Sequence, residues 1–277
     1  MYQPYWGLTE SPFRGNFDPR FFYQGPSQDE AIARLHFLVD EKRAMGLLLS
    51  DPGGGKSLVL QMFARQVRQV GHQKASINLI GLDAREFLWL VAMRLGAEVS
   101  SDAGQIKLFQ AVSDHMVANH YQQLNTVLLL DDADEARADV KDCIVRLAES
   151  SIIRGAPLTI VLAAQGARLA RLGCRLLELS ELRIDLERWD QDDSTRYVKG
   201  ALAAAGRSIP LFSDGALLRL HELGGGVPRR LKQLADLALL AGAGANLSQI
   251  EAETIESAFG ELSVLACEAP LAVATAS

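Results

Sequence analysis

The sequence is poor in cysteine and in aromatic residues, and it carries no excess of positive charge. Its three cysteines lie far apart without a Cys-x-x-Cys pair, which argues against a disulfide framework or a zinc site and for a reducing compartment. Lysine and arginine number 28 against 34 acidic residues, a formal net charge of −6. This balance leaves DNA possible as a partner but does not favour it. A local basic patch along Arg168, Arg171 and Arg175 stays open, beside the alternative of a solvated helix face.

Long apolar runs are also missing. No run approaches about 18 residues, so the sequence predicts no membrane span. The first residues, MYQPYWGLTESPF, lack a basic segment followed by an apolar core, so we expect no signal peptide here. These features predict a cytoplasmic protein.

What the sequence does contain is a regular alternation of apolar strands and helical patterns. The segments that read as strands are residues 45–49, 75–80, 126–130, 158–163 and 182–186. Helical patterns separate them, over about residues 56–69, 83–95, 103–120 and 136–150. Continuous apolar strands separated by helices are typical of a parallel sheet covered on both faces, so we predict an α/β fold of three layers.

The strand signals stop after Trp189. Helical patterns follow over about residues 192–205, 214–223, 228–240 and 247–259, with a break at 242–245. We expect residues 1–188 to form the sheet-containing core with an irregular N-terminal lead-in, residues 189–262 a small helical lid domain, and residues 263–277 a flexible tail. The lead-in ends near Ser27-Gln28-Asp29-Glu30, a pattern that predicts a capping box at the start of a helix.

Residues 50–57 read SDPGGGKS and follow the first predicted strand. Glycines let successive backbone N–H groups turn toward a phosphate, lysine reaches the β- and γ-phosphates, and a hydroxyl at a helix start binds Mg²⁺. The pattern Gly-x4-Gly-Lys-Ser is met except at Ser50, which fits in place of glycine if its φ stays negative. A glycine-rich turn without a ligand is the alternative. The predicted nucleotide-binding residues are Ser50, Asp51, Pro52, Gly53, Gly54, Gly55, Lys56 and Ser57.

The third predicted strand ends in two carboxylates, Asp131 and Asp132. The first carboxylate at such a strand end holds Mg²⁺ through water and completes the metal shell that Ser57 begins. The second can orient and deprotonate the attacking water. Glutamate is usual at that second position, so the shorter Asp132 is a conservative change that can slow hydrolysis. An ordinary acidic turn after a strand is the alternative.

Three more polar residues lie where they can act on a nucleotide. Gln165 follows the fourth predicted strand and can touch the γ-phosphate or the water, although a structural loop glutamine fits equally well. Arg229 follows the run GGGVP in the first turn of a helix, where it can fold onto a nucleotide or simply face solvent. Arg183, at the fifth predicted strand, can act in trans as an arginine finger, although other arginines lie near it.

With these motifs the chain resembles the ExeA-type ATPases, the general secretion pathway protein A family, within the AAA+ superfamily of P-loop NTPases. The opening WGLTESPF, the later DPRFFY and QDEAIARL, and the turn GGVPR carry the resemblance together with the nucleotide motifs. It covers about residues 1–260. The resemblance implies an AAA+ fold, with a parallel sheet and a small C-terminal helical lid.

The resemblance also implies a nucleotide site with ATP and Mg²⁺. Lys56 and Ser57 would bind phosphates and Mg²⁺, Asp131 would support Mg²⁺ and Asp132 would position water. The other residues implied for catalysis are Gln165 as the first sensor, Arg229 as the second sensor and Arg183 as the finger from a neighbouring subunit. The lead-in from Phe13 to Tyr23 would help to enclose the adenine.

Three positions depart from the family pattern, namely Ser50 for glycine, Asp132 for glutamate and Gln28 for histidine. The first two bear on the rate of hydrolysis more than on binding. Our main hypothesis is an ATPase that assembles as a homo-oligomer, completes its site from the neighbouring subunit and drives assembly or remodelling of a protein partner. The alternatives are a nucleotide-dependent DNA-binding regulator of the transposition-ATPase type and an ATP-binding switch with little hydrolysis.

Overall fold

The computed structural model describes residues 2–13, 19–100, 102–207 and 209–265, which form two compact units. The sheet unit comprises Gln24–Glu187, and the helical unit joins the segment up to Tyr23 with the segment from Arg188 onward. Of the predicted tail, residues 266–277 lie outside the described ranges, whereas residues 263–265 end the last helix.

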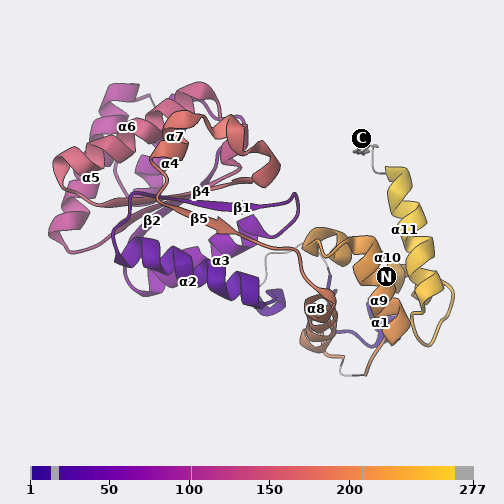
Figure 1. Cartoon of the computed structure of the whole chain (residues 1–277). Helices are drawn as coiled ribbons and strands as arrows, with labels where there is room; N and C mark the ends of the chain where they lie inside the picture. The colour runs from indigo at the N-terminus through magenta and orange to yellow at the C-terminus, as the bar shows by residue number, and fades with distance from the viewer. Residues whose placement is uncertain (1, 14–18, 101, 208, 266–277) are drawn as a thin grey trace, which may run out of the picture. The chain divides into compact units, whose positions relative to one another are not determined.

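A five-stranded sheet forms the centre of the sheet unit (Figure 1). Its strand order is β2-β3-β4-β1-β5 and every pairing is parallel. The strands are β1 (Met45–Ser50), β2 (Gln73–Asn78), β3 (Thr126–Asp131), β4 (Leu158–Gln165) and β5 (Leu182–Asp185). The parallel sheet predicted from the apolar runs is therefore confirmed.

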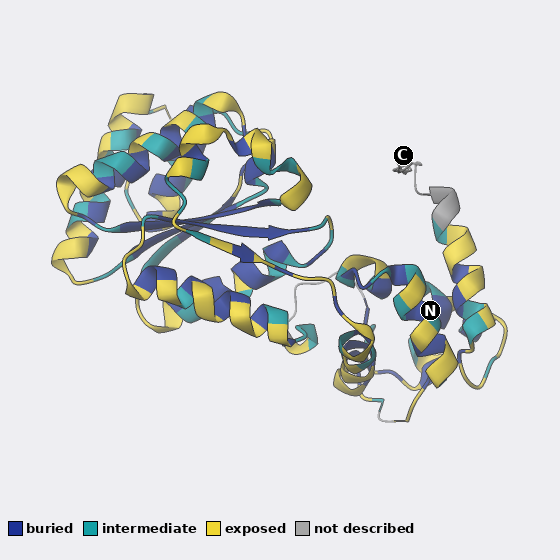
Figure 2. Ribbon diagram, viewed as in Figure 1, coloured by how far each residue is buried: buried dark blue, intermediate teal, exposed yellow. Residues whose placement is uncertain are grey.

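Helices cover both faces of the sheet (Figures 1 and 2). One face carries α2 (Pro26–Asp40) and α3 (Lys56–Gln69), and the other carries α4 (Ala84–Leu95), α5 (Gln105–Tyr121), α6 (Ala138–Arg154) and α7 (Cys174–Glu178). The central strands β1, β3 and β4 are almost entirely buried. Burial on both faces explains why these strands read as continuous apolar runs.

The strand order decides where polar side chains can meet. Strands β3, β4 and β1 are neighbours, and because they are parallel their carboxyl ends lie at one edge of the sheet. Ser50, the last residue of β1, pairs with Gln165, the last residue of β4. Open α/β sheets bind ligands at this edge.

The helical unit consists of α8 (Gln191–Ala204), α9 (Asp214–Gly224), α10 (Pro228–Gly244) and α11 (Ala252–Leu265), together with the N-terminal α1 (Gln3–Trp6) and the 3₁₀ turn η1 (Pro19–Phe21). The lead-in was predicted to belong to the sheet-containing core, and this is wrong for its described residues up to Tyr23, which belong to the helical unit. Tyr2, Trp6, Leu8 and Phe13 are buried among the helices of the helical unit. Burial of these large apolar and aromatic side chains is favourable, and it explains why the lead-in packs on the helical unit.

Trp6 offers a test of this placement. Its side chain is 2% exposed, and its indole Nε1 donates to the Leu239 carbonyl at 2.8 Å. Trp6→Phe keeps most of the apolar volume but loses this buried bond, so it should destabilise the helical unit by about 1–3 kcal/mol. Tyr5→Phe is the matched control, because the Tyr5 hydroxyl donates to the Leu247 carbonyl at an exposed position. Loss of this hydrogen bond leaves the carbonyl open to water.

The measurement is amide hydrogen exchange across α10 and α3 in both variants. For Trp6→Phe we expect faster exchange in α10 and unchanged exchange in α3. For Tyr5→Phe we expect unchanged exchange in both helices. Equal loosening of α3 would contradict the assignment of the lead-in to the helical unit.

Candidate functional site

The glycine-rich loop joins β1 to α3 in the sheet unit. Gly53 and Gly55 have positive φ values of 82° and 101°, a backbone region that residues with a Cβ rarely adopt. The helix α3 begins at Lys56 with Gly55 as its N-cap, and no side chain caps its first turn. Such a helix start presents backbone N–H groups and the positive end of a dipole, which suits an anion.

Ser50 fits at the first position of this loop. The non-glycine residues with positive φ in the described ranges are Lys42, Gln123, Asp132 and Asn246, so the condition that we placed on Ser50 is met. Its hydroxyl donates to the Asp51 carbonyl at 2.9 Å. A Cβ built on Gly54 would lie 2.6 Å from the Ser50 Oγ, so the serine fills space that a glycine would leave open.

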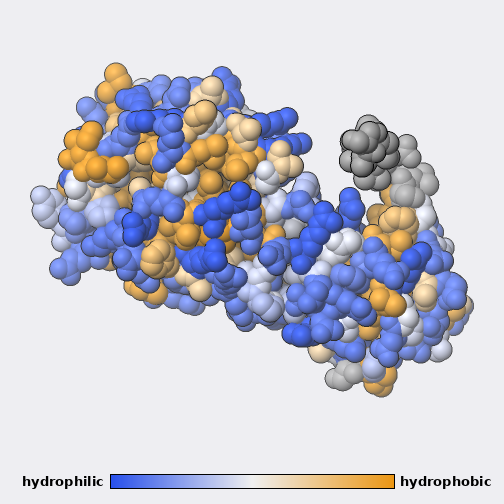
Figure 3. Space-filling model, viewed as in Figure 1, coloured by the Kyte–Doolittle hydropathy of each residue, from blue (hydrophilic) through white to orange (hydrophobic). Residues whose placement is uncertain are grey.

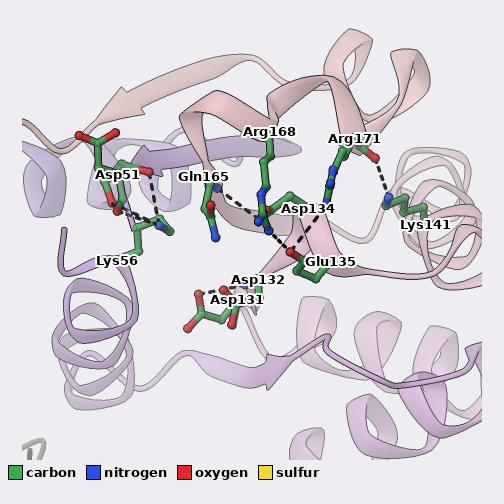
Figure 4. A network of polar contacts seen from close by, with 11 residues as sticks. Asp51, Lys56, Asp131, Asp132, Asp134, Glu135, Lys141, Gln165, Arg168 and Arg171 are labelled. Carbon is green, nitrogen blue, oxygen red and sulfur yellow. Dashed lines mark hydrogen bonds and ion pairs between the residues drawn. The ribbon is translucent and has the colours of Figure 1, made fainter. Parts of the chain in front are cut away.

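Lys56 lies within the loop and is 7% exposed. Its ammonium Nζ contacts the Ser50 Oγ at 3.2 Å and the carbonyl oxygens of Ser50 and Asp51 at 3.5 Å (Figure 4). A buried ammonium needs polar partners of this kind, because burial without them costs several kcal/mol. The loop therefore holds a cation where a phosphate would have to bind.

Asp131 lies close to the loop residues although 75 positions separate it from Lys56 in sequence. Burial, together with the neighbouring Asp132 charge, raises the pKa of the Asp131 carboxyl. A hydrogen bond from the Ser57 hydroxyl and the charge of Lys56 act in the opposite direction. Ser57 and Asp131 thus place a hydroxyl and a carboxylate oxygen side by side, which is a donor set that Mg²⁺ favours.

Asp132 adopts a left-handed conformation, with φ 52° and ψ 43°. Its backbone N–H donates to the Asp131 Oδ1 at 3.0 Å. Its own carboxylate accepts from the Asn78 side-chain amide at 2.7 Å. Because Asn78 ends β2 opposite Asp131, the sheet itself brings the amide to the carboxylate.

Sequence reasoning missed Asn78. The available signal was a polar residue close to the end of the second predicted strand, but nothing in the sequence says that β2 lies beside β3. The side chain is also anchored, since its Oδ1 accepts from the Ile80 N–H at 2.9 Å. Asn78 therefore orients the Asp132 carboxylate.

Gln165 lies at the end of β4, where Figure 4 shows its side chain extending toward the region between Lys56 and Asp131. Its backbone N–H donates to the Asp134 Oδ1 at 3.2 Å. Asp134 is a second residue that sequence reasoning missed. The structure thus brings Lys56, Ser57, Asp131, Asp132 and Gln165 to one edge of the sheet.

The basic patch that the sequence left open is an ion-paired surface. Arg168 and Arg171 both pair with Glu135, and Arg175 pairs with Glu149 and Glu178. Because carboxylates balance these charges, the arginines offer little excess positive potential to a polyanion. The alternative of a solvated, charged face describes them better.

Arg183 lies on β5, at the edge of the sheet next to β1. Its backbone pairs with Leu47 in the register of β1 and β5, three residues before Ser50, whereas Asp185 pairs with Leu49. Its guanidinium is exposed and makes two hydrogen bonds of 2.8 Å to the Asp185 carboxylate. The side chain of Arg183 is thus held by Asp185, and its predicted role as a finger stays a prediction.

Arg229 belongs to the helical unit, where it is exposed in the first turn of α10. Its predicted role as second sensor stays a prediction, as does the contact of the lead-in with adenine. None of the helices in the described ranges combines the length and apolar character that crossing a bilayer requires.

Comparisons with known proteins agree with this geometry. Residues 39–172 match the family model of the AAA domain. Over 245 residues, 87% of this chain, the sequence is 29% identical to general secretion pathway protein A of Aeromonas hydrophila. The matched part is 45% of that protein, so the chain spans less than half of the relative's length. The resemblance predicted from the motifs is confirmed.

Solved structures give the same fold. Cdc6p from Pyrobaculum aerophilum matches with a TM-score of 0.74 at 16% identity, over 92% of this chain and 71% of that chain. The ORC2 protein of Aeropyrum pernix, solved as ADPNP–ADP complexes, matches with a TM-score of 0.75 at 11% identity, over 95% and 74%. At these identities the likeness establishes the fold alone, which is the AAA+ P-loop fold with a helical C-terminal region.

Proposed function

We propose that this chain binds ATP with Mg²⁺ in the loop of residues 50–57, hydrolyses it, and works as a homo-oligomer that assembles or remodels a protein partner. The observation that carries the proposal is the convergence of Lys56, Ser57, Asp131, Asp132 and Gln165 at the carboxyl edge of β3, β4 and β1. A glycine-rich turn or an acidic turn alone would not explain why these groups converge.

The loop supplies the binding contacts. The uncapped first turn of α3 would receive phosphate oxygens, and the Lys56 ammonium would leave or share its contacts with Ser50 to reach the β- and γ-phosphates. Ser57 and Asp131 would hold Mg²⁺, directly and through water. The ion would neutralise charge that develops on the phosphate oxygens. Burial raises the pKa of the Asp131 carboxyl because it disfavours the charged form. A bound Mg²⁺ would offset that cost and keep the carboxylate ionised.

The carboxylate of Asp132 is the proposed base. Water attacks the γ-phosphorus, its proton passes to Asp132, and the bond to the β–γ bridging oxygen breaks, which gives ADP and inorganic phosphate. Asn78 orients the carboxylate through its 2.7 Å hydrogen bond. Gln165 would contact the γ-phosphate or the water from the end of β4.

The proposal of an oligomer follows from the place of Arg183 in the sheet. The Arg183 guanidinium is exposed on the edge strand β5, where Asp185 holds it, so we propose that it acts on a neighbour's nucleotide, as arginine fingers do. A neighbouring phosphate would compete with Asp185 for the guanidinium. Head-to-tail contacts of this kind can close into a ring.

Support for a protein partner comes from the surface of the sheet unit. Figure 3 shows apolar side chains gathered on part of this unit. Ile106 on α5, and Ile152 and Ile153 on α6, are 76%, 65% and 84% exposed. Exposed apolar patches often mark contacts with other proteins. The name of the curated relative suggests a secretion machinery as one setting for such a partner.

The test is ATP turnover by the purified protein with Mg²⁺ across a series of protein concentrations, with ATP binding measured in parallel. Turnover per subunit is expected to rise with concentration to a plateau, because a neighbour completes the site. Turnover independent of concentration would contradict an intersubunit site. Binding without turnover at any concentration would favour a nucleotide switch, and turnover that requires added duplex DNA would favour a DNA-dependent regulator.

A further inference from the structure

We propose that Asp134 is a positioning residue that fixes Gln165 relative to Asp132. The inference rests on the proposed ATP hydrolysis and concerns the two polar groups placed beside the attacking water. Asp134 follows Asp132 by two residues in sequence and contacts the backbone of Gln165, which ends the neighbouring strand β4.

The burial of Asp134 is the first argument. It lies in the 3₁₀ turn η2 (Ala133–Glu135), and its side chain is 0% exposed. Its Oδ1 accepts the Gln165 backbone N–H at 3.2 Å, whereas its Oδ2 is buried without a hydrogen-bond donor. Arg168 lies 3.9 Å from that second oxygen. Burying a carboxylate is costly, so packing alone does not account for an acid here.

The end of the strand ladder is the second argument. The pairing of β3 with β4 runs as far as Leu130 and Leu162. Beyond it, Asp132 turns into the left-handed region and the chain leaves the sheet, while β4 continues to Gln165. The Asp134 carboxylate accepts the Gln165 N–H in place of a backbone carbonyl of a neighbouring strand (Figure 4). This hydrogen bond joins η2 to β4 three residues after Leu162, where the pairing of β3 with β4 ends.

A side-chain tie of this kind has a catalytic consequence. A shift of the Gln165 backbone would move its side chain relative to the water held by Asp132, and small misplacements of polar groups in active sites cost rate more than they cost binding. Arg168 adds to the tie, because it contacts Glu135 in the same turn and follows Gln165 at the start of the 3₁₀ segment η3 (Gly166–Leu172).

The experiment compares Asp134→Ala, Asp134→Asn and Gln165→Ala in the full chain, with Asp142→Ala as the matched control on the exposed surface of α6. Asp134→Ala removes the acceptor and should lower kcat about tenfold while the Kd for ATP stays within about threefold. Asp134→Asn keeps an amide oxygen that accepts the same N–H, so it should restore most of kcat. The double variant Asp134→Ala with Gln165→Ala should be no slower than Gln165→Ala alone.

Amide exchange at Gln165 gives a readout that does not depend on turnover. Protection should fall in Asp134→Ala and return in Asp134→Asn. If the alanine variant does not fold, Asp134→Leu fills the same space without an acceptor and should show the same losses. An unchanged kcat, a double variant whose losses multiply, or an asparagine variant as slow as alanine would overturn the inference. Absence of turnover in the wild type would instead contradict the proposed function on which it rests.

Discussion

Asp132→Asn is expected to lower the maximal rate of ATP hydrolysis at least about a hundredfold, while ATP binds nearly as tightly as to the wild type. The amide keeps the size of the side chain and a hydrogen-bond acceptor, but it cannot take a proton from water. The Asn78 amide can still donate to the remaining oxygen, since that bond needs an acceptor and not a charge. Binding is spared because Lys56, Ser57 and the loop backbone are unchanged.

The measurement is steady-state turnover together with ATP affinity from a fluorescent nucleotide analogue. Asp142→Asn is the matched control, because it makes the same chemical change on an exposed position of α6 and should leave both quantities unchanged. A rate close to that of the wild type would exclude Asp132 as the base. A parallel loss of affinity would mean that the carboxylate serves binding, and the assignment of roles to Asp131 and Asp132 would have to be exchanged.

The sequence was sufficient to predict the sheet and the loop because both depend on local patterns. Buried parallel strands leave apolar runs, and the loop needs glycine at fixed spacings, which Gly53 and Gly55 meet with positive φ values. The carboxylates of Asp131 and Asp132 were found for the same reason, since they follow directly after a strand. Each of these features depends only on residues that are close together in the sequence.

Contacts between distant segments could not be predicted in this way. Asn78 and Asp132 are 54 positions apart, and their bond depends on the order of strands in the sheet. Asp134 was not singled out, because its burial follows from the packing of η2 on β4. The roles of such residues can be assigned only when the order of the strands and the packing of the turns are known.

Tertiary packing also overruled two local signals. Ser27 was predicted to cap α2, yet the helix begins at Pro26 behind Gly25, and the Ser27 hydroxyl accepts from the Glu187 N–H instead. Gly242 was taken as part of a break, yet α10 runs through it. A Cβ at Gly242 would lie 2.4 Å from Ile250 and 3.0 Å from Trp6, so this glycine allows close packing and does not end the helix.

Mixing two inactive variants is expected to restore activity if Arg183 acts in trans. Lys56→Ala removes the ammonium that would reach the phosphates but keeps the arginine, whereas Arg183→Ala keeps the loop but cannot supply a finger. Each alone should fall about a thousandfold or more below the wild type. In an equal mixture that assembles at random, about one quarter of the head-to-tail interfaces join an intact loop to an intact arginine, so about that share of activity should return.

The matched control is a mixture of Lys56→Ala with a second loop variant, Ser57→Ala, which offers no intact loop and should stay inactive. Arg34→Ala serves as a surface control for the arginine, because Arg34 lies near Arg183 and pairs with Glu30 on α2. No recovery in the first mixture, with oligomers formed by both variants, would show that Arg183 is not the finger. Recovery would show that the Arg183 guanidinium serves a neighbour's nucleotide, because no subunit in that mixture carries both an intact loop and an intact arginine.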